Sequence, residues 1–131
     1  MTEPLAVALA KKLRDAYNNF EADRPETLDL FTEDVVYSDP RFPTFEGKQA
    51  LKGYLQQLGG ENQALQVSWE YTNVVSEGDQ AAVEWMVRSG LDFGGGPFEF
   101  PGSAFFKVRD GKICYYCGYW DTAILQQLSG Q

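Results

Sequence analysis

Residues 35–43, VVYSDPRFP, end a β-branched and aromatic run with an aspartate that directly precedes a proline. Because a residue before proline is held extended, Pro40 would fix the Asp39 carboxylate at a strand end. Phe42 and Phe45 could shield that carboxylate from water and make it a useful general base. Asp-Pro is equally typical of a turn in which the carboxylate accepts backbone hydrogen bonds. Both interpretations, base and turn, stay open.

The other residues that could do chemistry narrow the choice. The chain has no histidine, which excludes Ser-His-Asp and Cys-His mechanisms and histidine metal sites. Cys114 and Cys117 form a C-x-x-C pair, but their Ile, Tyr and Trp neighbours favour a strand. Residues three apart on a strand point to opposite faces, so we expect two free thiols. The expected chemistry uses carboxylates, with no metal and no cofactor.

The composition bounds the kind of protein that must position these groups. The 131 residues, 44% of them hydrophobic and 15% aromatic, fit one globular domain spanning 1–131. A formal net charge of −8 would repel phosphate backbones and anionic membrane surfaces. The N-terminus lacks the pattern of a signal peptide, and no apolar run reaches bilayer length. We therefore expect a cytoplasmic protein with no nucleic-acid or membrane partner.

The periodicity of apolar residues changes along the chain. Helical spacing predicts helices over about 5–20, 27–31 and 47–58, the last one stopped by Gly59 and Gly60, with a strand at 35–39 between them. Alternation then predicts strands near 65–77, 81–89, 98–108 and 112–120, followed by a short helix capped by Asp121. Gly78-Asp79 and Asp110-Gly111 mark hairpin turns.

Helices first and strands afterwards is the pattern of an α+β fold. We expect four to six strands in a strongly curved antiparallel sheet that packs against the helices on one face. A sheet that wraps its helices encloses a pocket between them, and the many aromatic residues could line it. Trp69, Trp85 and the valines beside them exceed what one sheet face would bury, which predicts a homodimer formed through the sheet.

Four stretches, LDLFTEDVVYSDP, FEGKQALKGYL, VRDGKI and YWDTAILQQL, resemble the nuclear transport factor 2-like superfamily, which shares a cystatin-like α+β cone. The resemblance is greatest to its SnoaL-like polyketide cyclase and ketosteroid isomerase branches, and it spans about residues 9–128. It implies fold strongly and chemistry weakly, because the superfamily contains isomerases, cyclases, dehydratases, epoxide hydrolases and members without catalysis.

The resemblance assigns roles to single residues. Asp39 stands where steroid isomerases carry their proton-shuttling carboxylate, and Tyr17 is the counterpart of their first-helix tyrosine. Their third group, a protonated aspartate, is matched by Ser103. Cyclases and limonene epoxide hydrolases carry an essential aspartate where this chain has Gly118. Asp121 lies nearby, but its place suits a helix cap. No activity of the superfamily therefore has its full set of matching groups.

The expected pocket lining comes from three elements. Tyr116 and Trp120 of the last strand lie at isomerase-like positions that face the cavity, and Tyr54 joins them from the third helix. The strand at 81–89 allows two orientations: either its valines and Trp85 face the core, or Met86 and Arg88 line the pocket.

The expected ligand is a small, largely apolar cyclic molecule, such as a polyketide- or steroid-like substrate. We expect isomerisation or cyclisation by proton transfer through Asp39, assisted by Tyr17. A non-catalytic ligand-binding or dimerisation module of the same fold is the alternative, and Gly118 and Ser103 favour it.

Overall fold

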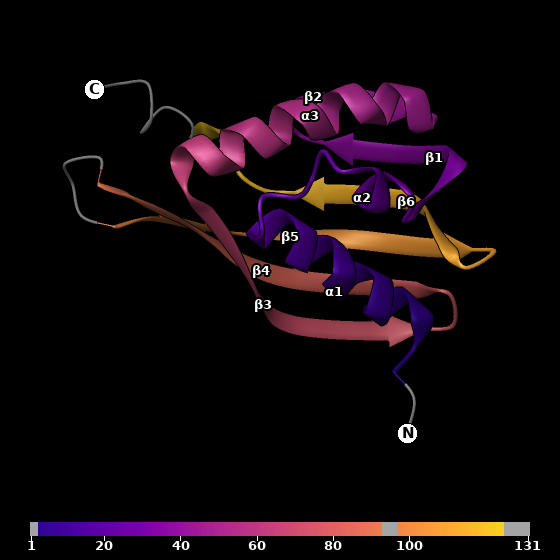
Figure 1. Ribbon diagram of the computed structural model, residues 1–131. Coiled ribbons are helices and arrows are strands. Elements are labelled where there is room, and N and C mark those ends of the chain that lie inside the picture. Colours follow the sequence, from indigo (N-terminus) through magenta and orange to yellow (C-terminus); the bar gives the residue numbers. More distant parts are fainter. Residues whose placement is uncertain (1–2, 93–96, 125–131) are drawn as a thin grey trace.

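The computed structural model describes residues 3–92 and 97–124 and has the predicted α+β architecture (Figure 1). Within these residues, three α-helices pack against one face of a six-stranded sheet. The helices are α1 (Leu5–Asn18), α2 (Pro25–Leu28) and α3 (Lys48–Leu65). The strands are β1 (Phe31–Asp39), β2 (Phe42–Glu46), β3 (Val67–Glu77), β4 (Gln80–Asp92), β5 (Pro97–Arg109) and β6 (Lys112–Tyr119), and a short 3₁₀ helix, η1 (Thr122–Ile124), follows.

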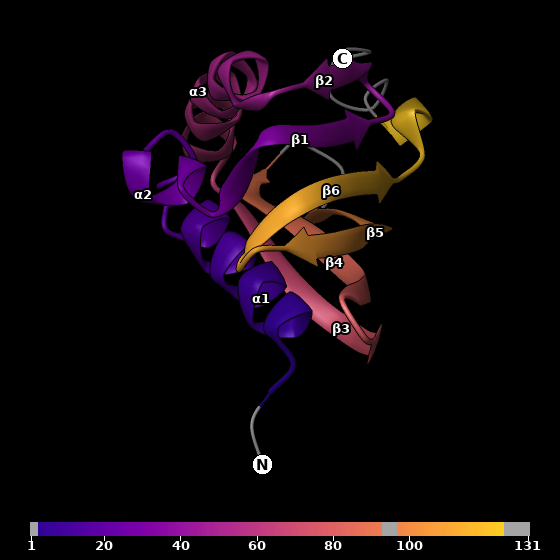
Figure 2. The ribbon, with the colours of Figure 1, turned by 90° about the vertical axis from the view of Figure 1, so that its right-hand side faces the viewer.

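The sheet curls around its helices without closing into a barrel, as Figure 2 shows. Its strand order is β2-β1-β6-β5-β4-β3. Pairing is antiparallel throughout except between β1 and β6, which run parallel. The expectation of a purely antiparallel sheet is corrected at this one pairing, because the meander from β3 to β6 returns the chain beside β1 in the same direction.

Helix α1 forms where helical periodicity predicts it and fills the concave face of the sheet. Its inward residues Leu9, Leu13 and Tyr17 are at most 5% exposed, and it packs against β3, β4, β5 and β6. From the sheet, Val83, Trp85 and Val87 meet the helices and are buried as well. These residues face the core, so the argument for a dimer built on their exposure no longer holds, and the homodimer stays a prediction.

Helix α3 is longer than its sequence predicts. It passes through Gly59 and Gly60 and ends at Leu65, followed by Gln66 in a left-handed conformation. Gly59 is buried, and a Cβ atom added to it would lie 3.6 Å from Asp23, so tertiary packing at this face of the helix offsets the poor helix propensity of the glycine pair. The predicted stop at Gly59-Gly60 is wrong, and the extra turns bring Glu61 and Asn62 to the sheet.

Two further boundaries differ from expectation. Phe31 starts β1 instead of ending a helix, and β2 was not predicted; it forms because the turn after Asp39 folds the chain back beside β1. Asp121 accepts the backbone N–H of Ala123 at 2.9 Å, as a cap would, while residues 125–131 of the predicted last helix lie outside the described residues.

Cys114 and Cys117 are free cysteines, as predicted. Among the helices that the structure describes, none is long and apolar enough to cross a membrane.

Candidate functional site

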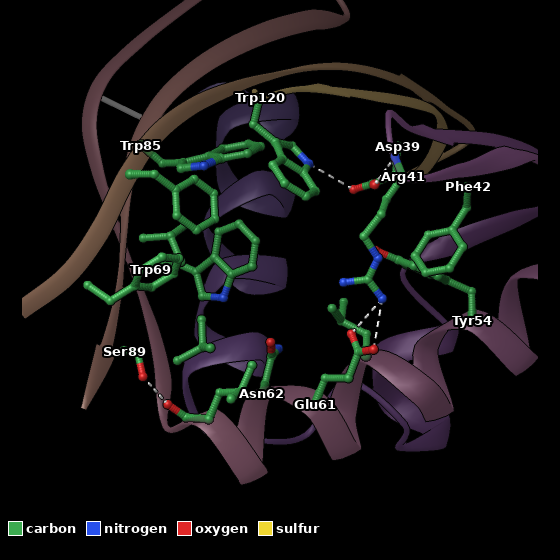
Figure 3. Close-up of a pocket in the computed structure, with 16 residues that line it drawn as sticks. Asp39, Arg41, Phe42, Tyr54, Glu61, Asn62, Trp69, Trp85, Ser89 and Trp120 are labelled. Carbon is green, nitrogen blue, oxygen red and sulfur yellow. Dashed lines mark hydrogen bonds and ion pairs between the residues drawn. The ribbon is translucent and has the colours of Figure 1, made fainter. Parts of the chain in front are cut away.

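A pocket lies between the second half of α3 and the open end of the curled sheet (Figure 3). It holds about 750 Å³ of empty space, counting the part that is open to solvent. Most of its lining is apolar or aromatic, which suits a largely apolar ligand. The lining residues are Asp39, Arg41, Phe42, Tyr54, Leu58, Glu61, Asn62, Leu65, Val67, Trp69, Trp85, Val87, Ser89, Phe98, Phe100 and Trp120.

Asp39 serves the turn and lines the pocket at once. One carboxylate oxygen, Oδ1, accepts the backbone N–H of Arg41 at 2.9 Å, which closes the turn between β1 and β2. The other, Oδ2, accepts the indole Nε1–H of Trp120 at 3.2 Å (Figure 3). These two bonds hold the carboxylate in one orientation at the pocket wall, as a positioned base requires. The two interpretations of Asp39 are therefore compatible.

Arg41 does not form an ion pair with the carboxylate of Asp39. Its guanidinium Nη2 contacts both carboxylate oxygens of Glu61 on α3, at 3.0 and 2.8 Å, and its Cζ lies 4.4 Å from the ring centre of Phe42. This ion pair connects the β1–β2 turn to α3 along one wall of the pocket (Figure 3). The positive charge of Arg41 is thus already matched within the protein.

Four tyrosines form a buried cluster next to the pocket. The hydroxyls of Tyr17 and Tyr37 are hydrogen-bonded at 2.9 Å. The ring of Tyr37 stacks on Tyr116 with centres 4.1 Å apart and lies 5.2 Å from that of Tyr54. Burial raises the pKa of all four phenols well above the usual range. They stay protonated at neutral pH and can act only as neutral groups.

Of these four, Tyr54 lines the pocket, whereas Tyr17 and Tyr116 do not. The hydroxyl of Tyr17 is directed to Tyr37, away from the predicted pairing with Asp39. Tyr116 contributes by packing: it supports Tyr37 and meets Phe106 edge to face. Trp120 lines the pocket as predicted, and its ring lies 5.5 Å from that of Phe100.

The predicted pocket role of Met86, Arg88 and Ser103 is corrected by their positions. Met86 and Arg88 alternate with the buried Trp85 and Val87, so they lie on the outer face of the sheet. Arg88 is exposed there and pairs with Glu70 and Glu99.

Ser103 lies opposite the exposed Glu84 and Tyr119 in the sheet register, which places it on the same outer face. None of these three residues reaches the pocket.

The indole of Trp85 covers the inner surface of the sheet where the superfamily resemblance places an acid. A Cβ atom added to Gly118 would lie 3.3 Å from the Tyr116 ring and 3.7 Å from the Trp85 ring. A Cβ added to Gly102 would lie 2.5 Å from Trp85 Nε1. Both glycines therefore make room for aromatic rings, and Trp85 packs closely over the place where an acid would project.

We expect Gly102→Ala to destabilise the protein by about 1–3 kcal/mol, because the new methyl group overlaps the buried Trp85 indole. Gly60→Ala is a matched control, since nothing lies within 4 Å of its added Cβ and it sits inside a helix. It should stabilise the protein by about 0.5–1 kcal/mol. Urea unfolding of both variants checks the pair, and equal effects would contradict the close packing at Gly102.

The lining residues that sequence reasoning missed include Glu61, Asn62, Trp69 and Trp85. Glu61 and Asn62 were missed because the helix was predicted to end at Gly59, before either residue. The two tryptophans were expected in the core or at an interface, and only the curl of the sheet shows that their rings face a cavity.

The comparisons with known proteins agree with this geometry. The model of the SnoaL-like domain matches residues 11–116. A proposed polyketide cyclase from Xanthomonas campestris pv. campestris is 26% identical, with a TM-score of 0.68, 97% of this chain covered and 96% of that one. A proposed isomerase from Bacillus subtilis is 19% identical, with a TM-score of 0.77 and 96% and 93% covered.

An LEH-like epoxide hydrolase from M. tuberculosis is 20% identical, with a TM-score of 0.70 and 96% and 90% covered. Among curated proteins, none matches the sequence. The similarity at these identities concerns the fold.

Proposed function

Because this chain belongs to the SnoaL-like domain family, we propose that it binds a small, largely apolar cyclic molecule and moves a proton on it through Asp39. The observation that carries the proposal is the carboxylate itself. It is held by Arg41 N–H and Trp120 Nε1–H at the wall of an aromatic pocket. The similar structures described as a cyclase, an isomerase and an epoxide hydrolase support an activity on small molecules.

The proposed step needs one base and no external reagent. On a ring ketone with a β,γ double bond, Asp39 takes a proton from the carbon between the carbonyl group and the double bond. The electron pair moves into a dienolate, and the same carboxyl group returns the proton to the γ-carbon. The product is the conjugated ketone, an isomer of the substrate, so atoms and charge balance. The protonated Tyr54 phenol in the lining can donate a hydrogen bond to the ligand.

Binding without catalysis is the second candidate, and two placements favour it. Ser103 faces outward, and Trp85 packs over Gly118, so neither position supplies a second acid. This alternative keeps the same ligand class and loses only the proton transfer.

Two measurements on the wild-type protein test the proposal. All three tryptophans line the pocket, so a bicyclic ketone such as 1-tetralone should change their fluorescence on binding. The protein should also convert 3-cyclohexen-1-one to its conjugated isomer, followed by ultraviolet absorbance. Binding without isomerisation would favour the non-catalytic alternative, and absence of both would exclude the proposed pocket function.

A further inference from the structure

Two buried hydrogen-bond donors in the pocket have no partner among the described residues. They are the amide Nδ2 of Asn62 on α3 and the indole Nε1 of Trp69 on β3. Asn62 is only 3% exposed, and both residues line the pocket. In Figure 3 the amide of Asn62 and the indole nitrogen of Trp69 are turned toward the hollow between helix and sheet.

The surrounding contacts hold Trp69 in place. Its backbone N–H donates to Asn18 Oδ1 at 2.7 Å, and its carbonyl accepts from Asn18 Nδ2 at 3.0 Å. Its ring meets Trp85 edge to face at 5.2 Å and lies 5.7 Å from Tyr17. A side chain so enclosed does not turn easily to find another acceptor. The donor is therefore preorganised.

Unpaired donors of this kind are unfavourable for folding. A buried polar group without a partner keeps the full cost of its desolvation, so native proteins retain few of them. Asn62 and Trp69 both carry this cost in the lining of one cavity. Hydrogen-bond acceptors on a ligand in this cavity would remove the cost.

A third unpaired donor, Trp85 Nε1, does not belong to the same group. It lies against Gly102, where an added Cβ would come within 2.5 Å of it. This nitrogen therefore lies against Gly102 of β5, outside the subsite.

We propose that Asn62 and Trp69 form a subsite for a neutral oxygen acceptor, such as the carbonyl group of a ring ketone, lactone or ester. An anionic group fits less well, because Asp39 and Glu61 also line the pocket and Arg41 is already paired with Glu61. A hydrocarbon without oxygen would leave both donors unpaired. Sites built to hydrogen-bond an oxygen reject such analogues strongly.

The inference deepens the proposed function and rests on it. Asp39 is the last residue of β1. Trp69 lies on β3, the strand at the far edge of the sheet, and β6, β5 and β4 lie between these two strands. A ligand with an oxygen held by Asn62 and Trp69 would extend its carbon frame across the pocket toward the carboxylate, where the carbonyl group that activates the transferred proton must lie. The subsite then determines which end of the ligand meets the base.

The test compares three bicyclic probes of similar size by ligand-observed NMR titration. They are 1-tetralone, with a neutral acceptor; tetralin, with none; and 1,2,3,4-tetrahydro-1-naphthoate, with an anionic one. The wild-type protein should bind 1-tetralone about tenfold more tightly than either other probe. Asn62→Leu and Trp69→Phe should each reduce the preference over tetralin by about five- to tenfold.

Thermal unfolding gives a second readout that does not depend on a ligand. Asn62→Leu keeps the branched shape of the side chain and removes an unpaired buried amide, so its Tm should rise by about 3–6 °C. Gln63→Leu, at the next and exposed position of α3, is the control and should change neither Tm nor preference.

The outcomes separate the two proposals. If no probe binds, the proposed function and the subsite are both wrong. If tetralin binds as tightly as 1-tetralone, or if the preference survives in both variants, only the subsite is wrong. A tighter complex with the naphthoate would also overturn it, because the acceptor would then be anionic.

Discussion

Asp39→Asn is expected to lower the rate of 3-cyclohexen-1-one isomerisation by about 100-fold or more, the usual contribution of a positioned base. The amide can still accept the N–H of Arg41 and keep the turn, whose carboxylate bond is 2.9 Å in the native protein. It cannot take up a proton at neutral pH. Affinity for 1-tetralone should change little, so the loss appears in kcat while binding is kept.

Trp120→Phe is the matched control for this prediction. It removes the indole donor to Asp39 Oδ2 but leaves the carboxylate and an aromatic ring in the pocket. We expect a smaller loss, about tenfold, because the base remains and only its orientation loosens. An Asp39→Asn variant with wild-type turnover would contradict the role of Asp39 as the base and leave a binding protein.

The protein should lose its stability steeply between about pH 11 and 12, since unfolded tyrosines ionise near pH 10. Burial raises the pKa of Tyr17, Tyr37, Tyr54, Tyr71 and Tyr116 in the folded state. Below about pH 10 these tyrosines are protonated in both the folded and the unfolded state, so their full contribution to the free energy of unfolding is present. Above that value the unfolded chain releases protons that the folded one keeps, and stability falls until the folded pKa is reached.

Each such tyrosine lowers the free energy of unfolding by about 1.4 kcal/mol per pH unit, so five lower it by about 7 kcal/mol per pH unit. A typical domain has only about 5–15 kcal/mol in total. Urea unfolding at a series of alkaline pH values measures the slope. Tyr37→Phe, which keeps the ring that stacks on Tyr116, should reduce that slope by about a fifth. Folded protein whose buried tyrosines ionise near pH 10 would contradict the prediction.

Much of the fold follows from local patterns in the sequence. Leu9, Leu13 and Tyr17 recur at helical spacing, and all three are buried on α1. Asp110 and Gly111 both take positive φ angles in the turn between β5 and β6, as the dipeptide predicts. These patterns depend on a few neighbouring residues, so they can be recognised in the sequence without knowing the contacts of the folded chain.

The candidate site depends on contacts that no local pattern contains. The propensity of Gly59 and Gly60 predicts an end of the helix, but packing against Asp23 continues it and delivers Asn62 to the pocket. Whether the indole nitrogen of Trp69 finds an acceptor depends on side chains from other elements. For Asp39, the sequence suggests either a turn or a base, and only the structure shows that one oxygen closes the turn while the other accepts the Trp120 indole N–H at the pocket wall.

The parallel pairing of β1 with β6 also determines when the site can form during folding. Asp39 and Trp120 lie 81 positions apart in the chain. Strand β1 can pair with β6 only after β3, β4 and β5, which lie between them in the sequence, have been synthesised. Contacts of such sequence separation slow folding, because a long loop must close before they form. On the ribosome the Asp39 carboxylate would remain without its indole partner until the last strand emerges. A chain that ends before Lys112 would expose the unpaired edges of β1 and β5, which favours aggregation.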